Sequence, residues 1–315
     1  MPAPGHNSPH NHDTLLSALL AAIKTRWPQL YRRAPDFWQL TRMHRPIGIF
    51  LLLWPTLWCL WIAGKGSPSL ANVIIFTLGT VCMRAAGCCI NDYADRNFDS
   101  QVKRTAERPL ATGKVAPREA LLCCAVLCLV AFALVLLTNR LTVLMSFGGL
   151  ALALLYPFMK RHTHLAQVVL GAAFSWGGMM AFTAQTDALP VQAWLLYVGN
   201  VLWTVVYDTE YAMVDRDDDV RLGLKSTAIL FAEADRMIIG FLQVMCLWTM
   251  VLAGQRFELG TWYYYGLLAA GALFFWQQKL IYNRERNACF KAFLQNNYVG
   301  LVIFAGTVLA LSTGR

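Results

Sequence analysis

Apolar residues run along most of this chain in long stretches that short polar segments separate. Beyond Arg45 we count nine stretches of about 15–22 mostly apolar residues, and each is long enough to cross, or nearly cross, a hydrocarbon core about 30 Å thick. They lie at 46–63, 69–90, 118–138, 141–158, 165–185, 190–207, 237–254, 259–277 and 297–312. The pattern predicts an all-α fold, a polytopic membrane bundle of about nine transmembrane helices.

The first 35 residues follow a different pattern. Residues 1–13 are polar and rich in His and Pro, and they lack the basic segment followed by an apolar segment that a cleaved signal peptide needs. The apolar stretch at 15–23 is too short to span a membrane, which favours a helix lying in the interface. We therefore predict a polar tail with an interfacial helix at 1–35 and a transmembrane domain at 36–315.

Composition supports the membrane assignment. Of the 315 residues, 57% are hydrophobic and 14% are charged, whereas an ordinary soluble domain carries about 25% charged residues. The nine cysteines lie mostly inside the apolar stretches, none of them forms a Cys-x-x-Cys pair, and the single His-x-x-x-His spacing lies in the polar tail. A disulfide framework and a zinc site are therefore disfavoured, and we interpret the cysteines as buried structural thiols.

The formal net charge of +9 comes from basic residues that gather on one side of the predicted bundle. Nine spans put the N-terminus and every loop after an even-numbered span on the same side, and that side holds 22 of the 27 Lys and Arg residues. The opposite side holds four, and Arg84 alone lies inside a span. By the positive-inside rule, the N-terminus and these loops are cytoplasmic. The charge is thus a signal of topology and does not indicate nucleic-acid binding.

Acidic residues concentrate in two windows on that same side. Half of the eighteen Asp and Glu residues lie at 91–99 and 208–219, directly after the second and the sixth predicted spans. If the two helices continue past the membrane, three polar side chains in each window share one helix face. These are Asn91, Asp95 and Asp99 in the first window and Asp208, Asp215 and Asp219 in the second. Stacked carboxylates repel one another unless a cation compensates them, and ligands that offer only oxygen indicate a hard cation such as Mg²⁺.

Basic side chains flank the acidic windows. Carboxylates that bind a metal, beside Lys and Arg side chains that contact oxygen atoms directly, are what a diphosphate leaving group requires. The basic candidates are Lys103, Arg104, Arg108, Lys160, Arg161 and, just before the first span, Arg45. Two other interpretations stay open. The windows could be solvated polar loops, or they could hold the cation-relay carboxylates of a transporter, although such carboxylates lie inside the membrane and these lie at span ends.

Both windows resemble the signatures of the UbiA family of intramembrane prenyltransferases. The first signature, NDxxDxxxD followed by RTxxRPL, is matched by NDYADRNFD at 91–99 and KRTAERPL at 103–110. The second signature, DxxxD, is matched within YDTEYAMVDRDDD at 207–219, which is followed by GLKST at 223–227. Two complete signatures at the corresponding span ends make a specific resemblance.

The resemblance extends over about residues 36–315 and implies a fold, a cofactor and residue roles. The family fold is a helix bundle around a central cavity, with the two Asp motifs facing each other across its cytoplasmic mouth. The residues that the resemblance implies would hold Mg²⁺ on the prenyl diphosphate are Asn91, Asp95, Asp99, Asp215 and Asp219. The four Asp residues among them are also the implied catalytic groups. Residues implied to support the ligands or to bind the substrate are Asp92, Asp208, Lys103, Arg104 and Lys160. Aromatic residues near the motifs that could stabilise an allylic cation are Tyr93, Tyr156, Tyr207 and Tyr211.

Two further segments, RMHRPIG at 42–48 and YPFMKR at 156–161, are similar to the branch of the family that acts on 4-hydroxybenzoate. This implies transfer of a polyprenyl group from polyprenyl diphosphate to the ring carbon ortho to the hydroxyl, with release of diphosphate, in ubiquinone biosynthesis at the bacterial inner membrane. A carboxylate entering an apolar cavity needs a cation, which Arg161 or Arg45 could supply. The same chemistry on another acceptor, and a cation-coupled transporter, stay open as alternatives.

Overall fold

The computed structural model describes residues 24–26, 28–159 and 161–313, and in this part of the chain every regular element is helical. The α-helices are α2 (Pro28–Leu40), α3 (Ile47–Ala63), α4 (Leu70–Asp95), α5 (Pro117–Val135), α6 (Arg140–Met159), α7 (Ala166–Thr186), α8 (Ala193–Leu222), α9 (Thr227–Phe231), α10 (Asp235–Arg256), α11 (Thr261–Leu280) and α12 (Arg286–Thr313). Two 3₁₀ helices, η1 (Asp99–Gln101) and η2 (Ala232–Ala234), lie in connections. The predicted all-α fold is confirmed.

The long helices correspond to the apolar stretches of the sequence. Within the described residues, α3 to α8 and α10 to α12 each overlap one of the nine predicted stretches. Six helical segments of this part of the chain are long and apolar enough to cross a membrane, and α3, with 17 residues, is a shorter apolar helix. The chain is therefore an integral membrane protein, and the count of nine crossings stays a prediction.

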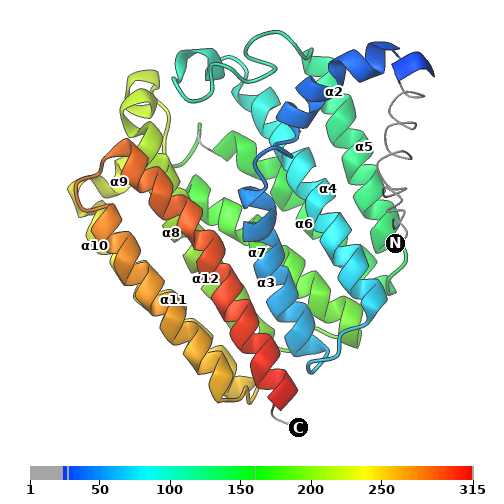
Figure 1. The fold of residues 1–315 in the computed structure, drawn as a ribbon, viewed down its shortest axis with the longest axis vertical. Helices are drawn as coiled ribbons and strands as arrows, with labels where there is room; N and C mark the ends of the chain where they lie inside the picture. The colour runs from blue at the N-terminus through cyan, green and yellow to red at the C-terminus, as the bar shows by residue number, and fades with distance from the viewer. Residues whose placement is uncertain (1–23, 27, 160, 314–315) are drawn as a thin grey trace, which may run out of the picture.

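The helices run side by side as a bundle (Figure 1). α3 packs against α4, α7 and α12, and α8 packs against α7, α10 and α12. α4 also packs against α5, α6 packs against α7, and α11 packs against α10 and α12. The two helices that carry the acidic windows, α4 and α8, thus have different neighbours, except that both of them contact α3 and α7.

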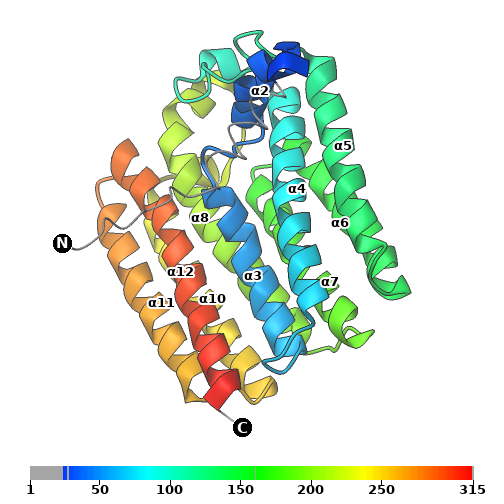
Figure 2. The same cartoon turned by 45° about the vertical axis from the view of Figure 1, so that its right-hand side comes forward.

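Both acidic windows lie at the same end of the bundle, which is the upper end in Figures 1 and 2. α4 continues to Asp95 and α8 continues to Leu222, so both helices extend beyond the apolar part of their sequence. Gly223 caps the end of α8, and its φ of 68° is the left-handed conformation that glycine adopts without strain. α2 and the segment between α4 and α5 lie at this end too, so the chain gathers its polar segments there.

The N-terminal prediction is only partly covered by the described residues. The polar tail and the interfacial helix at 15–23 lie outside them. The boundary drawn between residues 35 and 36 lies within α2, an amphipathic helix whose Tyr31 and Trp38 side chains are exposed. Arg33 of α2 donates to the Glu119 carboxylate at 2.8 Å, which connects α2 to the start of α5.

α11 and α12 approach each other closely where glycines face the partner helix. A Cβ atom on Gly266 would lie 2.8 Å from the carbonyl oxygen of Val302, and one on Gly306 would lie 2.8 Å from the carbonyl oxygen of Trp262. In a membrane, helices associate largely through van der Waals packing, and small residues allow their backbones to come together. These two glycines therefore set the distance between α11 and α12.

We expect Gly266→Ala to lower the thermal unfolding midpoint of the purified protein in detergent. The new methyl group meets backbone atoms that cannot move aside, and overpacking of this kind costs about 1–3 kcal/mol. Gly271→Ala on the same helix is the matched control, because a Cβ atom there meets only a Leu247 methyl group, at 3.4 Å. Equal midpoints for the two variants would contradict this account of the α11–α12 contact.

Candidate functional site

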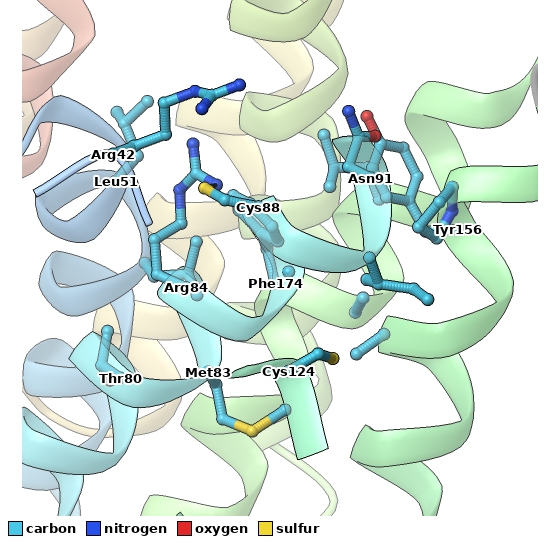
Figure 3. Close-up of a pocket in the computed structure, with 18 of the residues that line it drawn as sticks. Arg42, Leu51, Thr80, Met83, Arg84, Cys88, Asn91, Cys124, Tyr156 and Phe174 are labelled. Atoms are coloured by element: carbon cyan, nitrogen blue, oxygen red, sulfur yellow. Dashed lines mark hydrogen bonds between the residues drawn. The ribbon is translucent and has the colours of Figure 1, made fainter. Parts of the chain in front are cut away.

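A cavity of about 990 Å³ lies inside the bundle. Helices α3 to α8 and α12 line it, together with the connections before α3 and after α4. We call its polar end the cavity mouth, which is lined by Arg45, Asn91, Asp92, Arg104, Asp208, Asp215 and Asp219. Apolar side chains of α5, α6 and α7, among them Phe132, Leu150 and Met180, line the part of the cavity away from the mouth. Figure 3 shows part of the wall, where Arg84, Cys88 and Asn91 project from α4.

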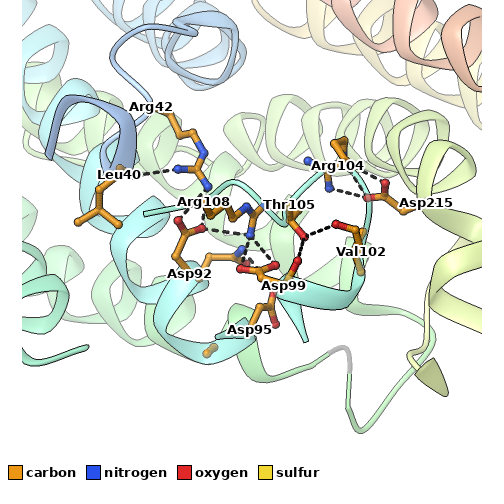
Figure 4. Close-up of polar contacts among 12 residues, drawn as sticks. Leu40, Arg42, Asp92, Asp95, Asp99, Val102, Arg104, Thr105, Arg108 and Asp215 are labelled. Carbon is orange, nitrogen blue, oxygen red and sulfur yellow. Dashed lines mark hydrogen bonds and ion pairs between the residues drawn. The ribbon is translucent and has the colours of Figure 1, made fainter. Parts of the chain in front are cut away.

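Asp92 of the first window is held by two arginines. The side chain is 1% exposed, and its carboxylate accepts hydrogen bonds from Arg42 Nη2 at 2.7 and 2.9 Å (Figure 4). Arg108 Nη1 lies 3.1 Å from the same carboxylate. Arg42 also donates to backbone carbonyl oxygens at the end of α2. This network joins α2 to the first acidic window and neutralises Asp92.

Asp95 and Asp99 are separated by the end of α4. The helix stops at Asp95, which accepts a hydrogen bond from Asn91 at 3.3 Å. Asp99 lies beyond a turn, in η1, where Arg108 donates to both of its oxygens at 3.0 and 2.9 Å. Burial raises the pKa of Asp99, and Arg108 opposes this shift. The predicted continuation of one helical stripe to Asp99 is therefore wrong, because the chain turns after α4 to bring Asp99 to Arg108.

Arg104 connects the two acidic windows. Its Nε atom donates to both oxygens of Asp215, at 2.9 and 3.0 Å, and its Nη2 atom pairs with the same carboxylate (Figure 4). The guanidinium lies over the ring of Tyr211, 4.4 Å from the ring centroid. Burial lowers the pKa of Arg104, but Tyr211 and Asp215 raise it by more, so the net pKa is raised and the side chain stays charged. Arg104 thereby fastens the segment after α4 to α8.

The second window presents several predicted residues to the cavity. α8 runs without interruption through Asp208, Tyr211, Asp215 and Asp219, and their spacing places them on one helix face. All four line the cavity, and Tyr156 of α6 lines it too. The structure therefore brings these residues together with Asn91, Arg104 and Arg45.

Other predicted residues are not part of the cavity wall. Lys103 is exposed, and neither it nor Asp95 nor Asp99 contributes to the lining. Arg161 is also exposed, and its guanidinium donates to the carbonyl oxygen of Ala94 and lies 5.5 Å from the centroid of a phenylalanine ring in the connection after α4. Lys160 lies outside the described residues, so its contact with diphosphate stays a prediction.

The donor chemistry at the cavity mouth fits a hard cation, although the carboxylates are not assembled around one point. Asn91, Asp208, Asp215 and Asp219 offer only oxygen donors suited to such a cation. In the part of the chain that the structure describes, however, no three Asp, Glu, His or Cys side chains are placed to hold a metal ion. Arginines pair with carboxylates of both windows instead.

Arg84 is a cavity residue to which the sequence motifs gave no role. It lies within the apolar part of α4, its Nη1 atom donates to Cys88 Sγ at 2.6 Å, and its Nε atom is buried with no hydrogen-bond partner. Gly48 of α3 makes room for it, because a Cβ atom there would lie 2.2 Å from Arg84 Nε. A charged side chain inside a membrane span is costly and marks a functional position. In the sequence, the signal for this role was that Arg84 is a single charged residue inside an apolar span.

Two phenylalanines of α12 complete the wall beside Arg104. Phe290 and Phe293 line the cavity, and the ring centroid of Phe293 lies 4.6 Å from that of Tyr211. The centroids of Phe290 and Phe293 are 6.1 Å apart. No sequence motif pointed to these residues, since α12 is far from both acidic windows along the chain.

Comparison with known sequences gives relatives over most of the chain. The profile of the UbiA prenyltransferase family matches residues 52–303. A protein of Ectopseudomonas mendocina named 4-hydroxybenzoate octaprenyltransferase is 61% identical over 281 residues, which cover 89% of this chain and 95% of the relative. The protein of the same name from Pseudomonas entomophila is 63% identical over 281 residues, with the same coverage.

Solved structures have the same fold. A UbiA homologue from Aeropyrum pernix superposes with a TM-score of 0.73 at 25% identity, covering 82% of this chain and 97% of the homologue. A UbiA homologue from Archaeoglobus fulgidus, solved with GPP and Mg²⁺ bound, gives a TM-score of 0.67 at 16% identity and covers 88% and 100% of the two chains. With the family profile, the close relatives and the cavity that joins both Asp windows, the chain belongs to the UbiA prenyltransferase family.

Proposed function

We propose that this protein transfers a polyprenyl group from polyprenyl diphosphate to the ring carbon ortho to the hydroxyl of 4-hydroxybenzoate and releases diphosphate. The observation that carries the proposal is that one cavity joins residues of both acidic windows to an apolar interior. The printed name of the close relatives supports the same donor class and the same acceptor. The reaction belongs to ubiquinone biosynthesis.

The diphosphate of the donor suits the cavity mouth. Arg104 is charged and presents a planar group of donors that matches phosphate oxygens, and Arg45 lines the same region. Asn91, Asp208, Asp215 and Asp219 would hold Mg²⁺ there, and the ion would act as a Lewis acid toward the departing diphosphate. The Archaeoglobus homologue, solved with GPP and Mg²⁺ bound, supports a prenyl diphosphate and a divalent cation as the ligands.

The prenyl tail suits the apolar part of the cavity. Phe132, Leu150 and Met180 belong to three different helices that line it. A tail that fills this space excludes water from the reacting carbon, which protects an allylic cation from hydrolysis. The walls of α5, α6 and α7 therefore contribute to the chemistry as well as to binding.

Transfer requires that the carbon–oxygen bond to diphosphate break and a carbon–carbon bond form. Tyr211, Phe290 and Phe293 lie beside Arg104, where positive charge develops on the allylic carbon as diphosphate leaves, and aromatic faces stabilise such charge. The acceptor ring, activated by its hydroxyl, supplies the electron pair of the new bond. The ring carbon then loses its proton, which restores aromaticity.

The carboxylate of the acceptor suits Arg84 better than Arg161. Arg84 lines the cavity, and its Nε atom is buried with no hydrogen-bond partner, whereas Arg161 is exposed and donates to a backbone carbonyl oxygen. Burying a carboxylate is favourable only when a well-placed cation pairs with it, and a guanidinium can do so with two hydrogen bonds. Arg45 at the cavity mouth is the second candidate.

We also propose that the protein lies in the inner membrane of a bacterium with its cavity mouth toward the cytoplasm. The support is the distribution of basic residues, because the side with the cavity mouth carries 22 of the 27 Lys and Arg residues in the predicted topology. The donor tail then enters from the lipid phase and diphosphate leaves into the cytoplasm.

Diphosphate release by the purified protein tests the proposed function. With a short prenyl diphosphate as donor, we expect release only when 4-hydroxybenzoate and Mg²⁺ are both present. A transporter would release no diphosphate under any of these conditions. Parallel assays with dihydroxynaphthoate and homogentisate identify the acceptor, and faster release with either would replace 4-hydroxybenzoate in the proposal.

A further inference from the structure

We propose that Arg104 is an exchangeable counter-ion of Asp215. A diphosphate replaces Asp215 as the partner of Arg104, and this frees Asp215 for a divalent cation, so that the cation and the diphosphate bind cooperatively. The proposal rests on the proposed function only for the identity of the diphosphate donor. It explains why the described carboxylates form ion pairs with arginines although their chemistry suits a metal ion.

The Asp215 carboxylate is fully engaged by Arg104. Among the residues that the structure describes, Arg104 supplies all the hydrogen bonds that reach this carboxylate, and both oxygens take part. The side chains of Arg104 and Asp215 are 25% and 11% exposed, so water can replace little of the interaction. A cation that binds to Asp215 must therefore displace the guanidinium.

Displacement without a new partner is unfavourable. Removing one member of a buried pair leaves the other charge uncompensated, and a divalent cation at Asp215 would also repel the positive charge of Arg104 at short range. Both penalties therefore oppose binding of the divalent cation in the absence of diphosphate. Its affinity for the protein should be low in the wild type.

A diphosphate removes both penalties, because it gives Arg104 an anion of higher charge. The contact with Tyr211 keeps the guanidinium at the cavity mouth during this exchange, since the ring lies under it at 4.4 Å and is itself part of the cavity wall. Coupling of this kind is reciprocal, so the cation strengthens diphosphate binding by the same factor.

Arg108, a second arginine of the segment after α4, is arranged differently. Arg108 bridges Asp92 and Asp99, and Asp92 keeps its two hydrogen bonds from Arg42 Nη2 if Arg108 moves. Asp215 has no such second arginine among the described residues. Exchange at Arg104 therefore frees Asp215 to bind a metal ion, whereas Asp92 stays paired with an arginine.

Binding of Mn²⁺ alone, followed by electron paramagnetic resonance on the purified protein without any diphosphate, tests the proposal. We expect Arg104→Gln to bind Mn²⁺ at least about 10-fold more tightly than the wild type, because the competitor for Asp215 is gone. Arg104→Lys, which keeps the charge but loses the bidentate contact, should lie between the two. Arg286→Gln is the matched control, since Arg286 pairs with Asp217 and Asp218 farther along α8, and its Mn²⁺ affinity should equal that of the wild type.

The lysine variant separates this role from simpler ones. Removing a positive charge near a cation tightens cation binding by itself, so a residue that only binds diphosphate would give a gain in Arg104→Gln and none in Arg104→Lys, whereas loss of the two-nitrogen contact with Asp215 predicts a gain in both variants. An unchanged Mn²⁺ affinity in Arg104→Lys, or a lower affinity in either variant, would overturn the proposal. The gain must also vanish in the double variant Arg104→Gln/Asp215→Asn, and a gain that persists there would place the Mn²⁺ elsewhere. The titration needs no turnover, so it stands even if the proposed acceptor is wrong.

Discussion

Replacing Asp215 with asparagine should reduce kcat for prenyl transfer by at least about 10²-fold, the scale for the loss of one electrostatic stabiliser of a transition state. Asp215 lines the cavity on α8 and faces Arg104, which comes from the other acidic window. Asparagine keeps the size of the side chain and can still accept a hydrogen bond, but it has no charge with which to hold a divalent cation. Asparagine leaves the charge of Arg104 without its counter-ion, so the thermal unfolding midpoint is measured beside kcat to show that the variant is folded.

Asp217→Asn is the matched control for this experiment. Asp217 lies on the same helix two residues away, its side chain is 74% exposed, and its contact with Arg286 spans 3.5 Å. Turnover of this variant should stay within about twofold of the wild type, because exposed ion pairs contribute little. If Asp215→Asn retained near-normal turnover at saturating Mg²⁺, Asp215 would have no role in holding the cation.

Arg84→Gln should weaken the apparent affinity for 4-hydroxybenzoate by about 10-fold or more, which corresponds to about 1.4 kcal/mol. Arg84 lines the cavity within the apolar part of α4, so its guanidinium would pair with the acceptor carboxylate there. Glutamine can donate a hydrogen bond but cannot compensate the negative charge. The apparent affinity for prenyl diphosphate should change much less, because Arg84 lies about two turns of α4 before Asn91 at the cavity mouth.

Steady-state kinetics with each substrate varied in turn measure both effects. Arg161→Gln is the control, and we expect it to alter acceptor affinity less than Arg84→Gln does, because Arg161 is exposed and is bound to a backbone carbonyl oxygen. Should Arg161→Gln show the larger loss of acceptor affinity, the assignment made from the sequence would be preferred. A loss confined to Arg45→Gln would move the carboxylate to the cavity mouth.

Hydropathy alone predicted where the long helices lie, because a lipid environment requires apolar side chains over a fixed length. The predicted stretches at 69–90 and 190–207 became the longer helices α4 and α8, which continue to Asp95 and Leu222. Hydropathy could not show those ends, since the polar residues there favour a loop and a helix equally. The helical spacing of the polar residues in the second window predicted the extent of α8 better than hydropathy did, because α8 runs through the whole window.

The pairing of arginines with carboxylates could not be predicted from the sequence. The chain between α4 and α5 is not a long regular element, so residue spacing does not determine which way Arg104 and Arg108 turn. Periodicity placed Asp99 on the α4 stripe, whereas the turn after Asp95 directs it to Arg108. The Arg84 environment depends on Gly48 of α3, which only the packed structure brings near.

Identification of the product tests the central claim most directly. Purified protein should convert a polyprenyl diphosphate and 4-hydroxybenzoate, with Mg²⁺, into a product whose mass is the sum of the polyprenyl group and the acceptor less one hydrogen atom. Nuclear magnetic resonance should show the prenyl group on the carbon beside the hydroxyl, with the carboxylate retained. A prenyl ether, an ester at the carboxylate, or unchanged substrates would contradict the proposal that this cavity joins the two substrates at the acceptor ring.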